Sequence, residues 1–206
     1  MPATDSPTLT PAAPAQANSE PNRYVLCHIP SNADFTQLSN KFDGREMLVE
    51  LLREIIADSQ DEFVPPLFSR NSTTQSNLIE NLENTGDAYV CAVASQENIL
   101  FLHNDKIVGV LSYIKDTNQF PNLFKPENAY LTTVIVDKDY RRKRIAQTMY
   151  QAFEQLNKRG NLYTRTWSKN DSHIKLLLKR GYAEVHRIAD DRGKGIDTVY
   201  YGKETK

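Results

Sequence analysis

A cationic turn is the stretch of this sequence best suited to chemistry. It holds Arg141, Arg142, Lys143 and Arg144, follows the apolar residues 134–136 and precedes an apolar stripe typical of an amphipathic helix. The first backbone N–H groups of a helix have no intrahelical partner, and with the positive end of the helix dipole they attract anions. We therefore expect a phosphate-binding site where a strand leads into this helix.

The elements that must position this turn can be placed from patterning. A strand is expected over residues 129–136 and a helix from about residue 142 to 158, capped by Gly160. Residues 88–94, 99–102 and 107–114 are interpreted as strands of an antiparallel meander, with Asn104 and Asp105 forming a tight turn. After the turn we expect strands over residues 162–167, 182–188 and 196–201, and a helix over residues 171–180 that stops at Gly181.

The N-terminal part is less regular. Residues 1–22 are rich in Pro, Ala and Thr, and we expect a disordered tail before a single domain over residues 23–206. A strand is expected over residues 24–29, a helix from the N-cap Asp43 to residue 56, and a polar helix that ends at Gly86. The apolar residues 63–68 suit packing over the sheet or an acceptor pocket. Altogether the pattern predicts an α/β fold of the α+β type, with a mixed, mainly antiparallel central sheet flanked by helices.

Composition excludes several classes of protein. The chain has 206 residues and a formal net charge of −1, so no global field attracts nucleic acid or an anionic membrane. Cys27 and Cys91 lie far apart in apolar runs, which argues against a disulfide framework and favours a reducing cytoplasm. The four histidines are scattered, so no metal site is expected. Without a signal-like N-terminus or about 18 consecutive apolar residues, we expect a cytoplasmic protein with no membrane partner.

Two motifs in this order of elements resemble the GCN5-related N-acetyltransferase (GNAT) family, over roughly residues 88–202. The family's central motif is a Gln or Arg, two variable residues, a Gly, one variable residue, and a Gly or Ala. Here it falls on residues 141–146, with Arg144 at the first Gly position. The later motif, an Asn before a short amphipathic helix that ends in Gly-Phe, is matched by Asn170, Leu176, Lys179, Gly181 and Tyr182.

The resemblance implies a GNAT-like fold and acetyl-CoA as a co-substrate, with no metal. Backbone groups of the strand would pair with the pantetheine arm, amides of the turn would hold the pyrophosphate, and the Asn would contact the pantetheine. The implied cofactor-binding residues are Val134, Ile135, Val136, Arg141, Arg142, Lys143, Arg144, Ile145, Ala146 and Asn170.

Two positions depart from the family pattern. Arg144 replaces a Gly, and we expect its side chain to project outward from a helical first turn, the alternative being an altered pocket. Leu177 stands where many members have a Tyr that protonates the departing thiolate, and Tyr182 and Tyr163 are candidates to replace it. Glu127 and Tyr130 are candidates for the general base, beside ordinary roles as a loop acid and a core aromatic. The catalytic residues therefore stay unassigned.

The function indicated is an acetyl-CoA-dependent N-acetyltransferase in which a primary amine attacks the thioester directly within a ternary complex. The acceptor, a small amine or a protein amine, is left open, and a homodimer is one option. Two alternatives remain: a noncatalytic acyl-CoA-binding regulatory module, favoured by the departures at Arg144 and Leu177, and a nucleic-acid-binding protein that uses residues 141–144.

Overall fold

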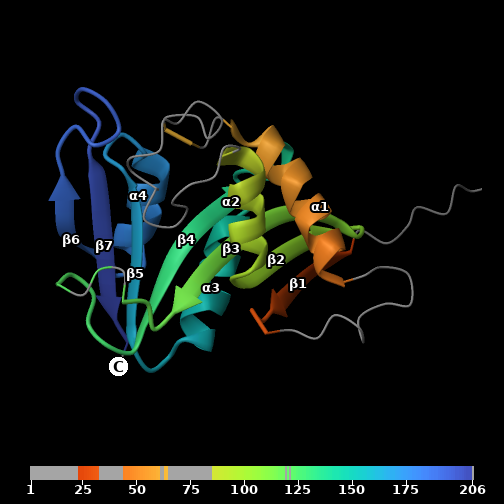
Figure 1. Cartoon of the computed structure of the whole chain (residues 1–206), viewed down its shortest axis with the longest axis horizontal. Helices are drawn as coiled ribbons and strands as arrows, with labels where there is room; N and C mark the ends of the chain where they lie inside the picture. The colour runs from red at the N-terminus through yellow and green to blue at the C-terminus, as the bar shows by residue number, and fades with distance from the viewer. Residues whose placement is uncertain are drawn as a thin grey trace, which may run out of the picture.

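The computed structural model describes residues 23–32, 44–60, 63–64, 85–118, 120 and 122–205 (Figure 1). Within these ranges the chain forms one α/β domain, as the sequence pattern predicts. The elements in chain order are β1 (Tyr24–Ile29), α1 (Gly44–Asp58), α2 (Thr85–Ala94), β2 (Glu97–His103), β3 (Lys106–Lys115), β4 (Asn128–Val136), a 3-10 turn η4 (Lys138–Tyr140), α3 (Ile145–Leu156), β5 (Asn161–Trp167), α4 (Asp171–Lys179), β6 (Ala183–Ile188) and β7 (Thr198–Glu204).

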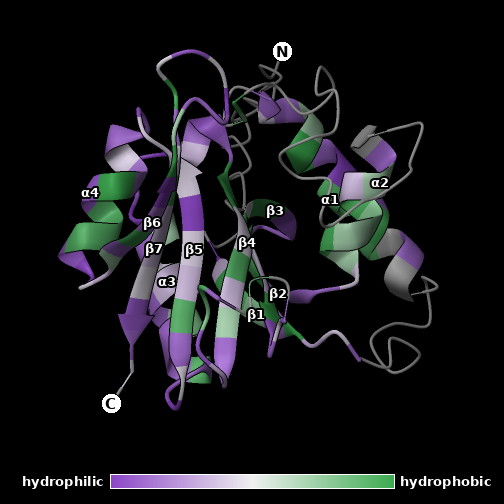
Figure 2. Ribbon diagram, turned by 60° about the vertical axis from the view of Figure 1, so that its left-hand side comes forward, coloured by the Kyte–Doolittle hydropathy of each residue, from purple (hydrophilic) through white to green (hydrophobic). Residues whose placement is uncertain are grey.

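The strands form one seven-stranded sheet in the order β1-β2-β3-β4-β5-β7-β6. Every neighbouring pair is antiparallel except β4 and β5, which run parallel because α3 carries the chain back between them. The helices α1 and α2 cover one face, and α3 and α4 cover the other (Figures 1 and 2). The expected mixed, mainly antiparallel sheet flanked by helices is confirmed.

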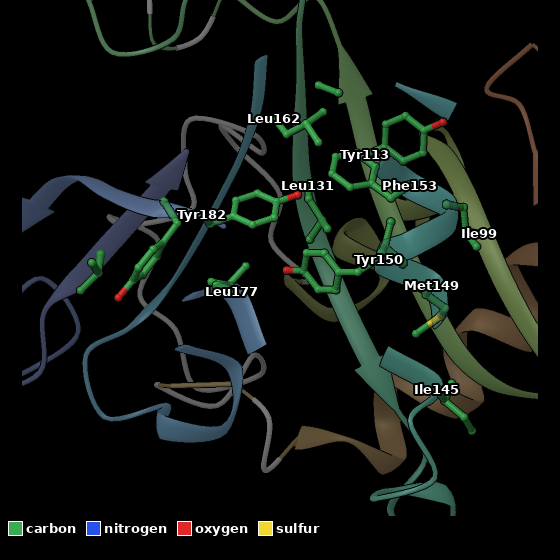
Figure 3. Close-up of a cluster of buried hydrophobic side chains, with 14 of the residues drawn as sticks. Ile99, Tyr113, Leu131, Ile145, Met149, Tyr150, Phe153, Leu162, Leu177 and Tyr182 are labelled. Carbon is green, nitrogen blue, oxygen red and sulfur yellow. The ribbon is translucent and has the colours of Figure 1, made fainter. Parts of the chain in front are cut away.

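Alternation along the strands divides the core in two. Successive side chains of a strand point to opposite faces, so Ile99 and Leu111 pack under α3 while Leu100 and Val110 pack under α1 and α2. Figure 3 shows the core beneath α3, which is rich in tyrosines as well as aliphatic side chains. A third, aromatic cluster of Phe124, Tyr130, Tyr163 and Tyr200 lies near the start of β4.

Two predicted turns form as expected. Asn104 and Asp105 both have positive φ (46° and 61°), the conformation that a two-residue hairpin requires to match the twist of its strands. Gly181 has φ 84° and ends α4, while the N–H groups of Gly181 and Tyr182 donate to the carbonyls of Leu178 and Leu177. This is the glycine-terminated helix end in which two otherwise unpaired carbonyls are satisfied.

The structure corrects the expected first strand of the meander. Residues 88–94 belong to helix α2, which also contains Gly86, so the prediction of a helix that ends at Gly86 is wrong as well. Tyr89, Val90 and Val93 are buried against the sheet at helical spacing. A short run rich in aromatic and β-branched residues fits a buried strand and a buried helix equally well. The expected tail (residues 1–22), the Asp43 cap and the apolar residues 65–68 lie outside the described ranges.

The boundaries of α3 also differ from the expected ones. The helix begins at Ile145 rather than near residue 142, and it ends at Leu156 with Asn157 as its C-cap. Gly160 is therefore not the cap. It lies against β4, where a Cβ would overlap the backbone carbonyl oxygen of Glu127, so the close approach of two chain segments explains the glycine.

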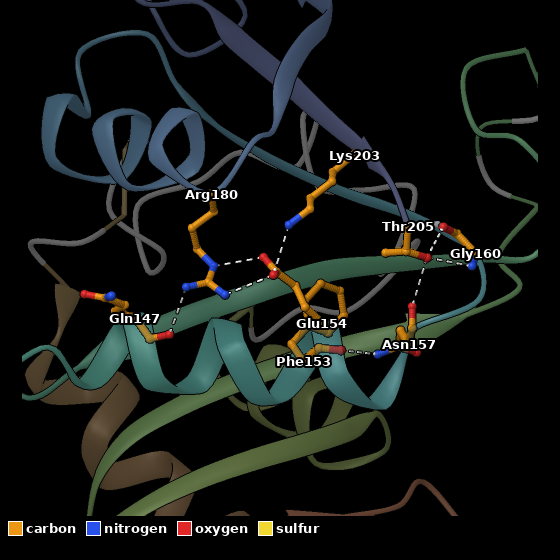
Figure 4. A network of polar contacts seen from close by, with 8 residues as sticks. All are labelled: Gln147, Phe153, Glu154, Asn157, Gly160, Arg180, Lys203 and Thr205. Carbon is orange, nitrogen blue, oxygen red and sulfur yellow. Dashed lines mark hydrogen bonds and ion pairs between the residues drawn. The ribbon is translucent and has the colours of Figure 1, made fainter.

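An ion-pair network fixes α4 and β7 to α3 (Figure 4). The guanidinium of Arg180, just after α4, donates two hydrogen bonds of 2.8 and 2.9 Å to the Glu154 carboxylate on α3. Lys203 on β7 donates a third, at 3.0 Å. These side chains are only 15–24% exposed, so solvent screens the interaction less than at an open surface.

Candidate functional site

The site begins where β4 and β5 separate. Their parallel pairing covers four residue pairs and ends at Leu131 and Thr164. At this point the Thr164 hydroxyl donates to the Leu131 carbonyl, at 3.2 Å. Beyond it β4 follows β3 and β5 follows β7, so a wedge opens between two strands that are neighbours in the sheet. We call the Leu131–Thr164 pair the vertex of the wedge.

A bulge in β4 explains the separation. Ser112 pairs with Thr133 and Tyr113 with Leu131, which leaves Thr132 as an extra residue on β4. A bulge bends its strand and increases the local twist, and this one lies next to the vertex. The Thr132 hydroxyl is held by the Gln96 side chain and by the Ser112 carbonyl.

A cavity of about 510 Å³ fills the wedge. Its lining includes Ile145 and Leu176 from the α3 and α4 side, and Phe63 and Tyr89 from the α1 and α2 side. The cavity therefore passes through the plane of the sheet. Among the described residues, its charged lining is entirely cationic: Arg141, Arg142 and Arg144 near the start of α3, and Arg165 and Arg192 toward the opposite face.

The cationic turn has an unusual backbone. Arg142 and Arg144 have positive φ (64° and 62°), and Lys143 between them does not. Alternation of this kind in a turn makes a concave array of backbone N–H groups that binds anions. It also gives a reason for the Gly in the family motif, since glycine adopts positive φ without steric cost. The expectation that Arg144 lies in a helical first turn is wrong, although its side chain is exposed.

The start of α3 opens into the cavity. The first intrahelical hydrogen bond runs from the Thr148 N–H to the Arg144 carbonyl, which leaves the N–H groups of Ile145, Ala146 and Gln147 without an intrahelical acceptor. Within the described chain, the Arg144 side chain makes no capping hydrogen bond. All three residues with unpaired N–H groups line the cavity, so a bound anion can accept from them.

The predicted site residues of β4 differ in whether their backbone groups bond to β3 or face the wedge. The Asp137 N–H donates to the Val108 carbonyl of β3, and hydrogen bonding alternates along an antiparallel pair. Ile135 therefore pairs with Val110, and its side chain is buried under α1 and α2. Val134 and Val136 direct their backbone groups into the wedge, where the Val136 carbonyl accepts from Arg141 Nε at 3.2 Å. The structure thus brings Val134 and Val136 to the site, but not Ile135.

Of two further predicted residues, Asn170 lines the cavity and Lys143 does not. Asn170 lines the cavity and caps α4, since its side-chain oxygen accepts from the His173 N–H at 3.3 Å. Lys143 is exposed and is not part of the lining, and its Nζ lies 4.5 Å from the centre of the Tyr140 ring. Of the ten predicted cofactor residues, those that line the cavity are Val134, Val136, Arg141, Arg142, Arg144, Ile145, Ala146 and Asn170.

The residues considered for proton transfer lie away from the cavity. Tyr130 and Tyr163 belong to the aromatic cluster, where burial raises the pKa of Tyr130 to about 12. Glu127 directly precedes β4, at the opposite end of the strand from the cationic turn. Tyr182 and Leu177 are buried in the core under α3 and α4.

Sequence reasoning missed the contact between Tyr150 and His173, of which His173 lines the cavity. The Tyr150 hydroxyl, on α3, lies 2.7 Å from His173 Nε2, on α4. Burial lowers the pKa of His173 to about 4 although the residue lines the cavity, and burial raises the pKa of the Tyr150 phenol. Both groups are therefore neutral near pH 7. The two residues are 23 positions apart, and no local pattern signals their contact.

On the opposite face, α2 supplies Tyr89, which sequence reasoning also missed. The Tyr89 hydroxyl is 2.6 Å from the Thr133 hydroxyl, and the Phe63 ring packs edge-on against the Tyr89 ring. The Arg165 guanidinium donates to the Tyr200 hydroxyl at 3.3 Å, and Arg192 Nε donates to the Thr198 hydroxyl at 2.9 Å. Had residues 88–94 been assigned as a helix, Tyr89 would have been expected on the face of that helix that packs against the sheet.

Across the described ranges, no group of His, Cys, Asp and Glu side chains is arranged to hold a metal ion. None of the helices in those ranges is both long and apolar enough to span a bilayer.

The chain was compared with known proteins. A model of the acetyltransferase (GNAT) family matches residues 52–182, well over half of the sequence. No curated protein matches the chain.

Several solved structures share the fold. An N-acetyltransferase from Staphylococcus aureus Mu50 is 14% identical, with a TM-score of 0.56 over 90% of this chain and 100% of its own. The ribosomal-protein-S18-alanine N-acetyltransferase from Escherichia coli is 13% identical, with a TM-score of 0.55 over 89% and 95%. NAA60 of Arabidopsis thaliana, in complex with a bisubstrate analogue, is 13% identical, with a TM-score of 0.55 over 88% and 99%. At such identities these likenesses show the fold alone. The family model matches residues that include the wedge, α3 and α4, and it shows that the chain belongs to the acetyltransferase (GNAT) family.

Proposed function

We propose that residues 23–206 form one catalytic domain that transfers the acetyl group of acetyl-CoA to a primary amine, by direct attack within a ternary complex. The observation that carries this proposal is the cavity that crosses the sheet at the vertex of the wedge. Acetyl-CoA supplies the acetyl group as a thioester. A cavity lined by residues from both faces of the sheet suits an acyl donor and an amine that meet from opposite sides.

The donor side of the proposal is supported by the chemistry of the turn. Backbone N–H groups of residues 145–147, the alternating turn and the guanidinium groups of Arg141 and Arg142 suit a pyrophosphate, since charge-assisted hydrogen bonds from several donors converge there. Val134 directs its N–H toward the wedge near the vertex, where it can donate to a thioester carbonyl oxygen as negative charge develops. Asn170 borders the same space.

The acceptor would enter from the α1 and α2 side, past Phe63 and Tyr89. The near-neutral chain charge does not select an acceptor class. One structural neighbour is named as an acetyltransferase of a ribosomal-protein alanine and another as an aminoglycoside acetyltransferase. Both protein amines and small-molecule amines therefore belong in a screen of acceptors.

Thiol release from acetyl-CoA across a panel of amines tests the proposal. We expect intersecting initial-rate lines with the best acceptor, as direct attack requires. Parallel lines would show a covalent acetyl-enzyme, and absence of release with every amine would remove the transferase assignment.

Two neighbouring cations provide a matched control for the phosphate site. Arg142 lines the cavity and Lys143 does not. Because one charge-assisted hydrogen bond contributes about 1.5–3 kcal/mol, we expect Arg142→Ala to weaken acetyl-CoA binding by about tenfold or more. Lys143→Ala should change it by about twofold or less. Equal losses of acetyl-CoA affinity in calorimetric titrations would mean that only the summed charge of the turn matters. The assignment of Arg142, and not Lys143, to the phosphate site would then be wrong.

A further inference from the structure

The wedge contains a polar pair, the buried Tyr150 and the half-buried His173, that the proposed transfer leaves without a role. Tyr150 is fully buried in the core under α3, and in Figure 3 its hydroxyl points away from α3 toward Leu131 and Leu177. The hydroxyl lies 2.7 Å from His173 Nε2, and His173 lines the cavity. Burial raises the pKa of the Tyr150 phenol, and hydrogen bonding with Thr164, at the vertex, lowers it by less. The pair therefore lies beneath the point where the two strands separate.

The protonation of the pair follows from burial. The phenol keeps its proton because burial raises its pKa, and a buried hydroxyl proton needs an acceptor. Among the described residues, the hydrogen bond of this hydroxyl is the 2.7 Å contact with His173 Nε2, and we take Nε2 as its acceptor. Burial also keeps the imidazole neutral, with a pKa of about 4, so the ring carries one proton and that proton is on Nδ1. Within the described chain, Nδ1 has no hydrogen-bond partner.

We propose that His173 Nδ1–H donates a hydrogen bond to the departing coenzyme A sulfur, and that Tyr150 holds the imidazole in the tautomer that makes this possible. This inference rests on the proposed function. When the amine attacks, the C–N bond forms, the C–S bond breaks, and the electron pair of that bond moves to sulfur. His173 stabilises the resulting thiolate without giving up its proton, and the proton lost by the amine leaves to solvent. His173 is thus a catalytic residue and Tyr150 a positioning residue.

Stabilisation without proton transfer is the step that fits the acidities. A thiol has a pKa of about 8.5, far below that of a neutral imidazole N–H or of the buried phenol. A proton on either group would therefore not move to the thiolate. A fixed donor aimed at developing charge needs no such transfer. Leu177 packs its apolar side chain in the core, so the pair would take over the role at sulfur that a tyrosine at this position has in many family members.

The thiol pKa of bound coenzyme A gives a test that does not depend on the acceptor. A donor at sulfur favours the thiolate, so the thiol in the wild-type complex should ionise at a pKa about 1 unit lower than in the His173→Leu complex, about tenfold in its acid dissociation constant. Thiolate absorbance in the ultraviolet measures this value. His173→Asn, whose amide nitrogen lies near the position of Nδ1, should keep most of the shift. His186→Leu removes an exposed histidine of β6 and should leave the value unchanged.

The tautomer can be read in the unaltered protein. Nitrogen NMR should show His173 protonated at Nδ1 and not at Nε2, and Tyr150→Phe should release this preference. A proton on Nε2 in the wild type overturns the proposal, as does an equal thiol pKa in the wild-type and His173→Leu complexes. Failure of the wild type to bind coenzyme A would instead remove the proposed function, and the NMR result would still decide the geometry of the pair.

With an acceptor in hand, the kinetic signature is a split between kcat and KM. A donor that acts on the departing sulfur should lower kcat of His173→Leu by about tenfold to a hundredfold, with little change in KM for acetyl-CoA. A change confined to KM would assign the ring to cofactor binding alone and would contradict the proposal.

Discussion

Substitution of Arg144 by Gly and by Ala should separate its backbone from its side chain. Both changes remove an exposed guanidinium. Only glycine relieves the positive φ of 62° at this position. Because both variants lose the same charge, the difference between their unfolding free energies reports the cost of the left-handed backbone conformation at residue 144.

The magnitude follows from two opposing effects. A left-handed conformation costs a residue with a Cβ about 1–2 kcal/mol, whereas the extra chain entropy of glycine costs about 0.5–1 kcal/mol. We expect the Gly variant to be more stable than the Ala variant by about 1 kcal/mol, or about 2–4 °C in Tm for a chain of this size. Were residue 144 in a helical first turn, the sign would reverse, because alanine exceeds glycine in helix propensity by about 1 kcal/mol.

Denaturant unfolding of both variants without ligand is the assay. The pair Gln147→Gly and Gln147→Ala is the control, since Gln147 is exposed within the first turn of α3 and there the Ala variant should be the more stable. An Ala variant at position 144 that matches or exceeds the Gly variant would refute the left-handed assignment. Any difference in coenzyme A affinity between the two variants would then report how the backbone positions the turn amides.

Two further predictions concern stability. Glu154→Ala leaves Arg180 and Lys203 without their shared carboxylate in a partly buried site, so it should cost about 2 kcal/mol of unfolding free energy by denaturant titration. Glu184→Ala removes a more exposed bidentate partner of Arg187 and should cost less than about 0.5 kcal/mol of unfolding free energy. Equal costs for the Glu154 and Glu184 variants would contradict the argument that solvent screens the exposed pair more strongly. Because the pKa of His173 is about 4 in the folded protein, below its ordinary 6.5, the unfolded chain takes up a proton first and stability should fall as pH drops from about 6.5 toward 4. The wild type should lose about 1–2 kcal/mol more than His173→Leu between pH 7 and 5, and parallel losses would show that the ring is not buried.

Local patterns in the sequence predicted much of the fold. Strand alternation and the pair Asn104–Asp105 located β2 and β3, and Gly181 located the end of α4. The run that became α2 could not be assigned, because aromatic and β-branched residues favour strands locally while burial of one helical face decides the outcome through tertiary packing.

The site was predictable where it depends on order along the chain. The arginines of the cationic turn, Val134 and Val136 of the strand before it, and Asn170 line the cavity because consecutive elements meet at the wedge. Positive φ at Arg144 was not predictable from the residue itself, since arginine has no preference for that conformation, whereas the Gly of the family motif at this position is typical of it. The contact between Tyr150 and His173 joins two helices whose relative placement is set by packing, so no spacing along the chain could reveal it.

Helix α3 connects the parts of the proposed mechanism. Its first turn offers N–H groups to a pyrophosphate, Tyr150 lies five residues further on, about 7–8 Å along the axis, and Glu154 follows four residues later to hold α4 through Arg180. Because α4 carries His173, the ion pair fixes the distance between the phosphate end of the site and the hydrogen-bond donor proposed for sulfur. Loss of Glu154 should therefore weaken the Tyr150–His173 contact as well as the fold, which makes the stability of this network part of the catalytic geometry.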